Sequence, residues 1–479
     1  MKNKSYWQDI TLPKGQVVKQ NLNVDVAIIG GGMTGIMCAY FLSTTNLKVA
    51  VFEKNQLVSQ TSSHTTAKIT TMHYTLLQQL VEHFNEDVAK AYFESNLQAM
   101  DLIKDIITKH QIDCDFEECF HILYDDEGDL IEKEKMIYQK LNLKNQDVEL
   151  KMKHQNFIAR NQQARFHPLK YLKKIIQICQ KNGVVFYENS KVENLKNHNL
   201  LFQFEANEYT INATHVVVST RFPISIGFHQ YNMQVYQSKS YLSFWPTKHK
   251  LKDCYLKVND PLQTFRPVKD GMIIGGFNQD DKNQKYIVDS IKELGQNLSF
   301  NKMKLFWSTQ DCMSNRILPY IGYYYSKDVF CYVATGFNKW GMTLSHISAR
   351  LISDLILKKE NQDIELFDPL KNRFDFKKSN TMTLLKHSYE GWIKNRLQMN
   401  KIIQSEIDGK VYRINYQLIG ATYNHHHQLT KISPICSHQK GVLSFDYNDR
   451  SWTCRCHGST FDCDGKVIFG PATKDLKKL

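Results

Sequence analysis

Four residues near the end of the chain have the types and spacing of an asymmetric iron–sulfur site. Cys436 and His438 form a Cys-x-His pair, and Cys454 and His457 form a Cys-x-x-His pair soon afterwards. Two thiolates can hold one iron of a [2Fe–2S] cluster while two neutral imidazoles hold the other. Because such a cluster carries less negative charge than one held by four thiolates, it accepts an electron more readily. The pattern predicts a centre that handles single electrons.

A structural zinc ion is the alternative occupant, since zinc also binds two cysteines and two histidines in tetrahedral geometry. Zinc fingers place their two cysteines together and their two histidines together. Here each loop supplies one of each. The order therefore favours the cluster.

A glycine-rich turn at the other end of the chain predicts a dinucleotide site. The apolar stretch 25–29 has the pattern of a buried strand, and G-x-G-x-x-G follows at once as Gly30, Gly32 and Gly35. These glycines allow a tight turn, a close pyrophosphate and close packing of the next helix. The next strand ends in Glu53, whose carboxylate suits a ribose hydroxyl. No second such motif follows a strand, which argues against paired FAD and NAD(P)H domains. An incidental glycine-rich turn is the alternative.

The periodicity of the remaining sequence predicts the elements that position these motifs. We expect an α/β doubly wound dinucleotide-binding domain, an inserted α+β substrate domain, and a small all-β domain at the C-terminus. The first two together span 20–365, and a linker with a connecting helix spans 366–400. The expected segments are 20–90, 155–225 and 325–365 for the doubly wound domain, 91–154 and 226–324 for the inserted domain, and 401–479 for the all-β domain.

The residues around the second Cys-His loop add to the first motif. The segment 457–462, followed by Asp464-Gly465 and Gly470-Pro471-Ala472, resembles the Rieske ferredoxin family. The resemblance implies a [2Fe–2S] cluster held by the four residues named first.

Two positions depart from the Rieske pattern. Many members have a disulfide between the counterparts of Cys456 and Gly441, so Cys456 is expected here to be a free, buried thiol. Many also have a tyrosine at Phe461 that donates to a ligand sulfur, and this chain keeps only Ser459 as such a donor. Donors to sulfur stabilise the reduced cluster and raise its potential. We expect a potential in the lower half of roughly −150 to +300 mV, the range of His-ligated clusters.

Four further segments, 62–68, 164–169, 318–322 and 334–343, resemble the D-amino-acid-oxidase-like FAD-dependent oxidoreductases, and most of all those fused to a C-terminal Rieske domain. The resemblance implies FAD as the cofactor, with Val192 touching adenine through its backbone. It also implies that the following residues lie along the flavin part of the site: Ser62, Ser63, Thr65, Gly336, Gly341, Met342 and Thr343.

Residues that act on the substrate are harder to predict. His64 falls in the segment expected to pass the flavin, and two interpretations stay open: a hydrogen-bonded loop histidine, or a covalent or catalytic partner of the flavin. Arg266 and Tyr241 could hold a substrate carboxylate or be structural. Oxidases of the family often carry a lysine beside the flavin on a strand like 271–275, but this strand has none. Rapid reaction with oxygen is therefore not expected.

The composition limits the partners. The chain of 479 residues has 61 basic and 48 acidic side chains, a formal net charge of +13. The excess is scattered and accompanies no nucleic-acid motif, so we expect no nucleic-acid partner. An acidic substrate, a redox partner or a peripheral contact with anionic lipid stays open. The first residues lack a hydrophobic signal core and no apolar run reaches ~18 residues, which predicts a cytoplasmic protein without an integral membrane segment.

Together these motifs predict a flavin dehydrogenase with a one-electron outlet. A small substrate, such as an amine or an amino acid, would reduce FAD, and the cluster would pass the electrons singly to an acceptor protein or a quinone. Two alternatives stay open. Electrons could enter from a donor at the cluster and drive a reductive or oxygenating reaction, or the chain could be a redox-sensing binding protein with little turnover.

Overall fold

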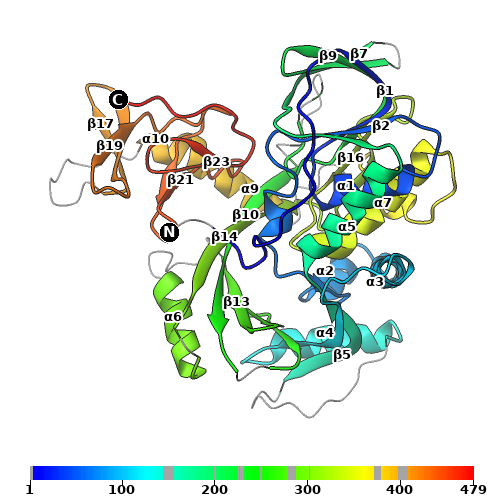
Figure 1. Ribbon diagram of the computed structural model, residues 1–479. Helices are drawn as coiled ribbons and strands as arrows, with labels where there is room; N and C mark the ends of the chain where they lie inside the picture. Colours follow the sequence, from blue (N-terminus) through cyan, green and yellow to red (C-terminus); the bar gives the residue numbers. More distant parts are fainter. Residues whose placement is uncertain are drawn as a thin grey trace.

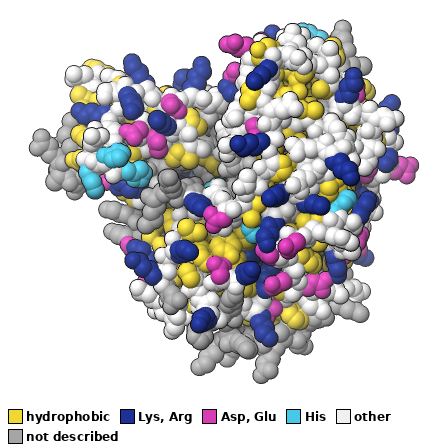
Figure 2. Space-filling model, viewed as in Figure 1, with side chains coloured by type: hydrophobic (Ala, Val, Ile, Leu, Met, Phe, Trp, Pro, Cys, Tyr) yellow, Lys and Arg dark blue, Asp and Glu magenta, His cyan; other side chains and the backbone are white. Residues whose placement is uncertain are grey.

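A computed structural model describes residues 4–143, 156–198, 201–224, 226, 231, 234–248, 251–278, 287–300, 302–371, 379–397 and 408–479. Two eight-stranded sheets form the larger part of the molecule, and two small sheets form a C-terminal domain beside strands β10 and β14 (Figure 1). Basic side chains are scattered over the face shown in Figure 2 and do not gather into one patch, as the sequence predicted.

The first sheet, here called the doubly wound sheet, has the order β15-β16-β9-β1-β2-β6, and the β7-β8 hairpin extends from β9. Strand β1 lies between β9 and β2 and is parallel to both. Its last four residues are buried because helices α1, α5 and α7 cover one face (Figure 1), while Phe202 and Phe204 of β8 belong to the apolar cluster on the other face. The elements are β1 Leu22–Ile29, α1 Met33–Leu42, β2 Val49–Phe52, α5 Pro168–Lys181, β6 Val185–Tyr187, β7 Val192–His198, β8 Leu201–Ala206, β9 Tyr209–Val218, β15 Tyr320–Tyr323, β16 Cys331–Thr335 and α7 Gly341–Ile356.

The second sheet, here called the cap sheet, has the order β14-β10-β13-β12-β11-β4-β5-β3. Its pairs are antiparallel except β11 with β4, which run parallel. The strands and their accompanying helices are β3 Lys68–Ile69, α2 Leu76–His83, α3 Glu86–Lys109, β4 Glu117–Tyr124, α4 Asp129–Lys140, β5 Phe157–Arg165, β10 Val235–Pro246, β11 Cys254–Lys257, β12 Gln263–Val268, β13 Gly271–Asn278, α6 Ile287–Asn297 and β14 Leu305–Ser314.

The chain crosses between these sheets at other points than the expected boundaries. Strands β3 and β5 belong to the cap sheet, although 20–90 and 155–225 were assigned to the doubly wound domain. Strand β15 belongs to the doubly wound sheet, although 226–324 was assigned to the inserted domain. Strand periodicity reports that one face is buried, but it does not report which sheet receives the strand.

The C-terminal domain is all-β, as predicted. One sheet contains β17 Lys410–Ile414, β18 Gln417–Tyr423 and β19 Leu429–Ile432, and the other contains β20 Ser444–Asp446, β21 Ser451–Thr453, β22 Thr460–Phe461 and β23 Val467–Phe469. Trp452 is fully buried between them. The connection comprises α8 Ile364–Phe367, α9 Ser379–Tyr389, the π-helical turn η4 Glu390–Lys394 and α10 Asn395–Leu397. The parts of the predicted linker at 372–378 and 398–407 lie outside the described residues.

Within the described ranges, none of the helices has both the length and the apolar character needed to cross a bilayer.

Candidate redox site

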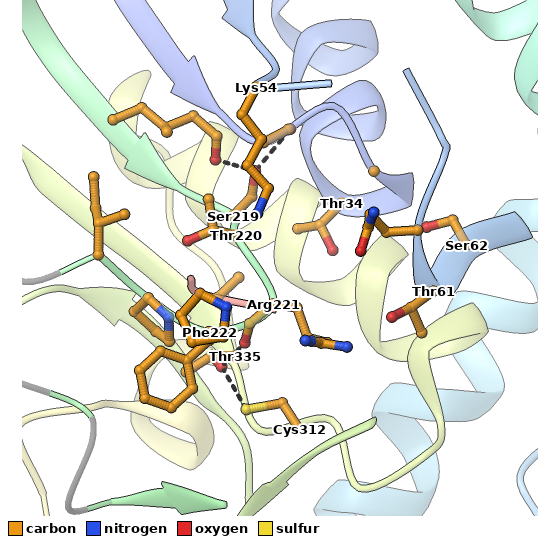
Figure 3. A pocket seen from close by; sticks show the side chains of 18 of the residues that line it. Thr34, Lys54, Thr61, Ser62, Ser219, Thr220, Arg221, Phe222, Cys312 and Thr335 are labelled. Carbon is orange, nitrogen blue, oxygen red and sulfur yellow. Dashed lines mark hydrogen bonds between the residues drawn. The ribbon is translucent and has the colours of Figure 1, made fainter. Parts of the chain in front are cut away.

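A cavity of about 530 Å³ opens where β1, β2 and β9 end and α7 begins. This volume lies in the usual range for sites that hold organic ligands, roughly 300–1,000 Å³. In Figure 3, Thr34 and Ser62 line one side, Cys312 and Thr335 lie across from them, and the Arg221 side chain extends into the space between.

The glycine turn has the shape that a dinucleotide requires. Gly30 adopts a φ of +113° and passes so close to β9 that a Cβ would lie 3.0 Å from the Ser219 carbonyl. A Cβ on Gly35 would lie 2.0 Å from the Gly30 oxygen, so this glycine lets α1 pack on the turn. Gly32 faces the cavity, and among the described atoms a Cβ there would approach only Ser62 Oγ, at 3.3 Å. The start of α1 has no acidic residue in its first turn, which suits an anionic pyrophosphate.

Glu53 lines the cavity at the end of β2. Its two carboxylate oxygens accept hydrogen bonds from the backbone amides of Gly31 and Asn55, each at 2.9 Å. The backbone therefore fixes the carboxylate at the mouth of the glycine turn, where a ribose hydroxyl would meet it.

Most residues predicted to bind the cofactor line this one cavity, although they come from distant parts of the sequence. They are Gly30, Gly32, Glu53, Ser62, Thr65, Val192, Gly336, Gly341 and Met342. The cofactor-binding role of each stays a proposal.

Three of the predicted residues face away from the cavity. Ser63 and His64 lie in the 3-10 turn η1, Thr61–Ser63, and its cap, where the serine hydroxyl and His64 Nδ1 both contact the Gln60 carbonyl, at 2.9 Å. Neither is among the lining residues, whereas their neighbours Thr61 and Ser62 are. Thr343 donates to Asn96 Oδ1 at 2.7 Å inside the core. The 3-10 turn decides which of these neighbouring side chains reach the cavity. Their proximity in sequence did not allow this to be predicted.

The four predicted cluster ligands converge in the C-terminal domain. The thiols of Cys436 and Cys454 contact each other, and the rings of His438 and His457 have centroids 5.1 Å apart at an interplanar angle of 84°. Both thiols are buried, and His457 is 6% exposed. His438 Nδ1 is buried and has no hydrogen-bond partner among the described residues. Two adjacent sulfurs and two adjacent imidazoles, one with an unpaired nitrogen, form a donor set that fits a [2Fe–2S] cluster.

The surroundings of the sulfurs agree with the expected departures from the Rieske pattern. Ser459 hydrogen-bonds the Cys436 thiol, and the backbone amide of Ala472 donates to the same hydroxyl at 3.1 Å. Phe461 is fully buried in the same apolar cluster and offers no donor. Cys456 is a buried free thiol, as predicted, and a Cβ on Gly441 would lie 3.0 Å from its sulfur.

The C-terminal domain forms part of the wall of the cavity. His438 lines it together with Gly470, Pro471 and Thr473. Phe222, which follows β9 and also lines the cavity, contacts both cluster histidines, with ring centroids 5.0 Å from His457 and 5.9 Å from His438. The cavity and the cluster site therefore share a wall, which His438 helps to form.

Two cations of the doubly wound domain join this wall. Lys54 follows Glu53 and donates to the Gly470 carbonyl at 2.8 Å. Arg221 lies over the Phe469 ring at 4.0 Å and donates to the Gln310 carbonyl at 3.2 Å. Burial lowers the pKa of Arg221 to about 10, so it stays charged at neutral pH. Neither residue is predicted by a sequence motif, although Lys54 lies directly next to Glu53, which is.

The docking of the C-terminal domain also depends on the cap sheet. Lys239 of β10 lies 2.6 Å from Asp446 Oδ2 and 2.5 Å from Asp449 Oδ2, and the Tyr241 hydroxyl donates to Asp446 at 2.5 Å. Burial alone would raise the pKa of Asp446, but Lys239 holds it below its ordinary value. Gln310 of β14 donates to the Thr460 hydroxyl at 2.8 Å. These polar contacts fix the domain against β10 and β14.

The two predicted carboxylate-binding candidates have other roles. Tyr241 belongs to this docking contact. Arg266 is buried, donates to the carbonyls of Phe166 and Pro267, and lies 4.6 Å from the Trp7 ring. The sequence left two roles open for each residue, binding of a substrate carboxylate or a structural role. The structure supports the structural role for both.

The connecting helix approaches the cluster loops at Gly391. Its carbonyl accepts from the Val442 amide at 2.8 Å, and a Cβ at Gly391 would lie 2.3 Å from Cys456 Sγ. The absence of a side chain therefore lets η4 pack directly on the loop that carries Cys454 and His457.

A buried lysine near the expected flavin end was also missed. Lys68 of β3 hydrogen-bonds Thr264, and it lines a small second cavity with His73, Trp340 and Met342. Burial lowers the pKa of Lys68 to about 8. Met342 lines both cavities, so the small cavity that contains Lys68 adjoins the 530 Å³ cavity at this residue. Strand 271–275, where oxidases of the family often carry a lysine, has none, and Lys68 comes from a different strand of the same sheet.

Comparisons with known proteins agree with this architecture. The model of the FAD dependent oxidoreductase family (DAO) matches residues 25–355, and that of the Rieske [2Fe-2S] domain matches residues 399–479. The chain belongs to the FAD-dependent oxidoreductase family. It is 31% identical to the putative Rieske 2Fe-2S iron-sulfur protein YhfW of Bacillus subtilis (strain 168), over 99% of this chain and 97% of the relative.

Two further likenesses cover the oxidoreductase part. Gamma-glutamylputrescine oxidoreductase of Escherichia coli (strain K12) is 20% identical over 74% of this chain and 88% of its own length. The crystal structure of glycine oxidase from Geobacillus kaustophilus has a TM-score of 0.60 at 18% identity, covering 72% of this chain and 98% of that one. The second likeness shows the fold alone. The protein is thus an FAD-dependent oxidoreductase with a Rieske domain, and it binds FAD and a [2Fe–2S] cluster.

Proposed function

We propose that the protein is a dehydrogenase that oxidises a small amine or amino acid and delivers the electrons singly to an external acceptor. When bound, FAD takes two electrons from the substrate, and the Rieske cluster passes electrons one at a time. The substrate class is supported by the similarity to gamma-glutamylputrescine oxidoreductase. The acceptor would be a redox protein or a quinone.

The observation that carries the proposal is the position of His438. This cluster ligand candidate lines the same cavity as Gly30, Glu53 and Gly336. An electron leaving that cavity would meet the cluster-bound imidazole without crossing another layer of protein. A domain that served only to stabilise the fold would not need to place a ligand residue in the cavity wall.

The residues of the chain divide the remaining tasks. The backbone around Gly30 and Gly32 is shaped to hold a pyrophosphate, and Glu53 to hold a ribose. Arg221 and Lys54 supply positive charge in the cavity and also contact the Rieske domain. The absence of a lysine from strand β13 favours a slow reaction with oxygen, so the cluster would be the principal outlet for electrons.

The test is anaerobic mixing of the FAD- and cluster-loaded protein with a panel of primary amines, secondary amines and amino acids. We expect at least one compound to bleach the flavin absorbance and to support reduction of a one-electron acceptor. In the variants Cys436→Ser and His457→Ala, bleaching should persist while reduction of the acceptor is lost. Cys179→Ala, which changes a buried thiol on α5, serves as the control.

Two results would reject the proposal. One is the absence of flavin bleaching by every compound while a reduced ferredoxin bleaches it, which would mean that electrons enter at the cluster. The other is full acceptor reduction by the ligand variants.

A further inference from the structure

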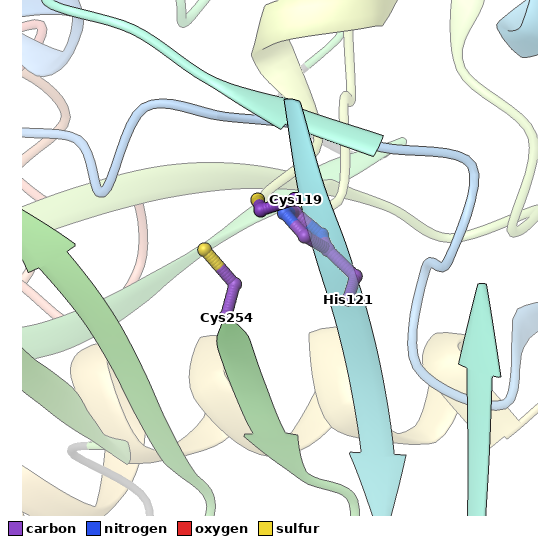
Figure 4. A group of neighbouring side chains, drawn as sticks. All are labelled: Cys119, His121 and Cys254. Carbon is purple, nitrogen blue, oxygen red and sulfur yellow. The ribbon is translucent and has the colours of Figure 1, made fainter. Parts of the chain in front are cut away.

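Three metal-ligating side chains meet in the cap sheet, far from the Rieske ligands in sequence. Cys119 and His121 lie on β4, and Cys254 is the first residue of β11 (Figure 4). The two sulfurs and an imidazole nitrogen all lie within 4.8 Å of one another. Among the described residues this is the one group of three or more such side chains at metal-binding separations.

Strand geometry brings the three together. Cys119 and His121 are two residues apart, so they project from the same face of β4. Cys254 pairs with His121 in the parallel register of β11 and β4 and therefore stands directly beside it. The register between β4 and β5 shifts between Cys119 and His121. The extra residue at this point lies in β5, since Cys119 pairs with Gln163 and His121 with Arg160, so β4 itself keeps its alternation.

An unpaired nitrogen at the same place points independently to a ligand. His121 is 4% exposed, and its Nε2 is buried with no geometrically satisfied hydrogen bond among the described residues, while its ring lies within hydrogen-bonding reach of the Cys254 thiol. Cys254 is 1% exposed and Cys119 is partly exposed, which leaves a path from solvent to the group.

Basic side chains surround the group. Lys68, Arg165 and Arg266 lie within electrostatic reach of the sulfur atoms. Thiolates with imidazole select soft or borderline ions such as Zn²⁺ and Cu⁺, whereas Mg²⁺ and Ca²⁺ require oxygen ligands. The donor set thus excludes the common hard cations.

We propose that Cys119, His121 and Cys254 bind one thiophilic closed-shell metal ion, with Zn²⁺ as the principal candidate and solvent as the fourth ligand. Zinc lies about 2.3 Å from sulfur and about 2.0–2.1 Å from imidazole nitrogen, which needs donors roughly 3.5–4 Å apart. A small contraction of the group meets this requirement. Binding releases the remaining thiol protons to water and involves no change of oxidation state.

The ion would join the two halves of the cap sheet. In the strand order, β11 and β4 form the only link between the part built from 235–314 and the part built from 68–165, within the described ranges. That link consists of four residue pairs, from Cys254↔His121 to Lys257↔Tyr124. A metal bound at its first pair would hold the edge of this short seam closed.

The experiment uses the whole protein, loaded with FAD and cluster and produced in zinc-supplemented medium. Zinc and iron are counted per chain, and zinc K-edge X-ray absorption reports the ligands. We expect one zinc beside two irons, with two sulfurs and one nitrogen in its shell. Cys254→Ala and His121→Gln should lose the zinc and keep the iron. Cys179→Ala, a buried thiol elsewhere, should keep both, and Cys436→Ser should lose iron and keep zinc.

The melting temperature gives a second measurement of metal binding, and it does not depend on catalysis. Zinc should raise the melting temperature of the wild-type protein and leave that of His121→Gln unchanged, because a ligand stabilises only the state that binds it. The same experiment can be done with Cu⁺ supplied under reducing conditions. Stabilisation of the wild-type protein but not of His121→Gln by Cu⁺ would support the site with a different ion. Zinc found only with the Rieske ligands, or a Cys119–Cys254 disulfide in metal-free protein, would overturn the proposal.

Discussion

Lys239 of β10 and Asp446 of the Rieske domain form a buried ion pair, with 2.6 Å between Nζ and Oδ2. Their side chains are 3% and 2% exposed, so neither charge can be solvated if the other is removed. The pair fixes the domain that carries His438 to the sheet that covers the flavin cavity. Electron transfer in this layout depends on that docking.

Removing Lys239 should therefore undock or destabilise the Rieske domain. Lys239→Met removes the cation that contacts both Asp446 and Asp449, and breaking such a buried pair costs about 3–5 kcal/mol. Limited proteolysis of the connection and chemical denaturation measure the effect. The matched control is Lys257→Met, whose partner Asp126 is half exposed, and it should cost less than about 1 kcal/mol. Equal effects of the two variants would show that docking does not depend on Lys239.

Phe461→Tyr should raise the potential of the cluster. The new hydroxyl can donate to a ligand sulfur, which favours the reduced state by about 1 kcal/mol, or about 40 mV for one electron. Redox titration followed by the cluster's optical or paramagnetic signal measures the shift. Phe445→Tyr, a partly buried change in the same domain, is the control and should leave the potential unaltered. A lower potential in Phe461→Tyr would contradict the role assigned to this position.

Gly441→Cys should restore a disulfide with Cys456. A Cβ at position 441 lies 3.0 Å from the Cys456 sulfur. Disulfide geometry places a Cβ about 3 Å from the opposite sulfur. Thiol counting after denaturation should show one thiol fewer in Gly441→Cys than in the double variant Gly441→Cys with Cys456→Ser, because the disulfide removes two of its twelve thiols and the double variant keeps all eleven. If Gly441→Cys instead shows one thiol more than the double variant, the geometry does not permit the bond.

Gly35→Ala should abolish FAD binding. Its Cβ would lie 2.0 Å from the Gly30 oxygen and would push α1 away from the glycine turn. Flavin absorbance of the purified protein measures the loss. Gly183→Ala is the control: with a φ of +91° and, among the described atoms, nothing within 4 Å of the new Cβ, it costs about 1–2 kcal/mol of strain and should keep its flavin. Flavin retained by Gly35→Ala would contradict the assigned turn.

Stability should depend on pH through Glu134 of α4. Burial raises the pKa of this carboxyl from 4.5 to about 8, although the Gln78 and Leu77 amides oppose the shift. The folded state therefore keeps a proton that the unfolded chain loses, and the free energy of unfolding falls as the pH rises from 4.5 to about 8. Glu134→Gln should remove this fall and be more stable above pH 8, by about 5 kcal/mol at most.

Denaturation curves at several pH values test this, with the exposed Glu132→Gln on the same helix as the control. The control should follow the wild-type protein at every pH. A wild-type pH dependence that persists in Glu134→Gln would assign it to another group.

The sequence by itself determined the parts of this protein whose chemistry is local. The glycine turn works through backbone shape within six residues, and each cluster loop supplies a sulfur and an imidazole at fixed short spacing. Such patterns can be recognised without knowing how the rest of the chain folds. The all-β C-terminal domain could be predicted for the same reason, because period-2 alternation is a short-range signal.

Only the tertiary structure decided which side chains face each site. Ser62 and Ser63 are neighbours, yet one lines the cavity and the other bonds the Gln60 carbonyl, because a single 3-10 turn separates their directions. Tyr241 could not be assigned to domain docking until the position of Asp446 was known. Cys119 and Cys254 are far apart in sequence, and only the register of β4 and β11 brings them together. Contacts of this kind depend on long-range strand pairing and domain packing, which leave no local pattern in the sequence.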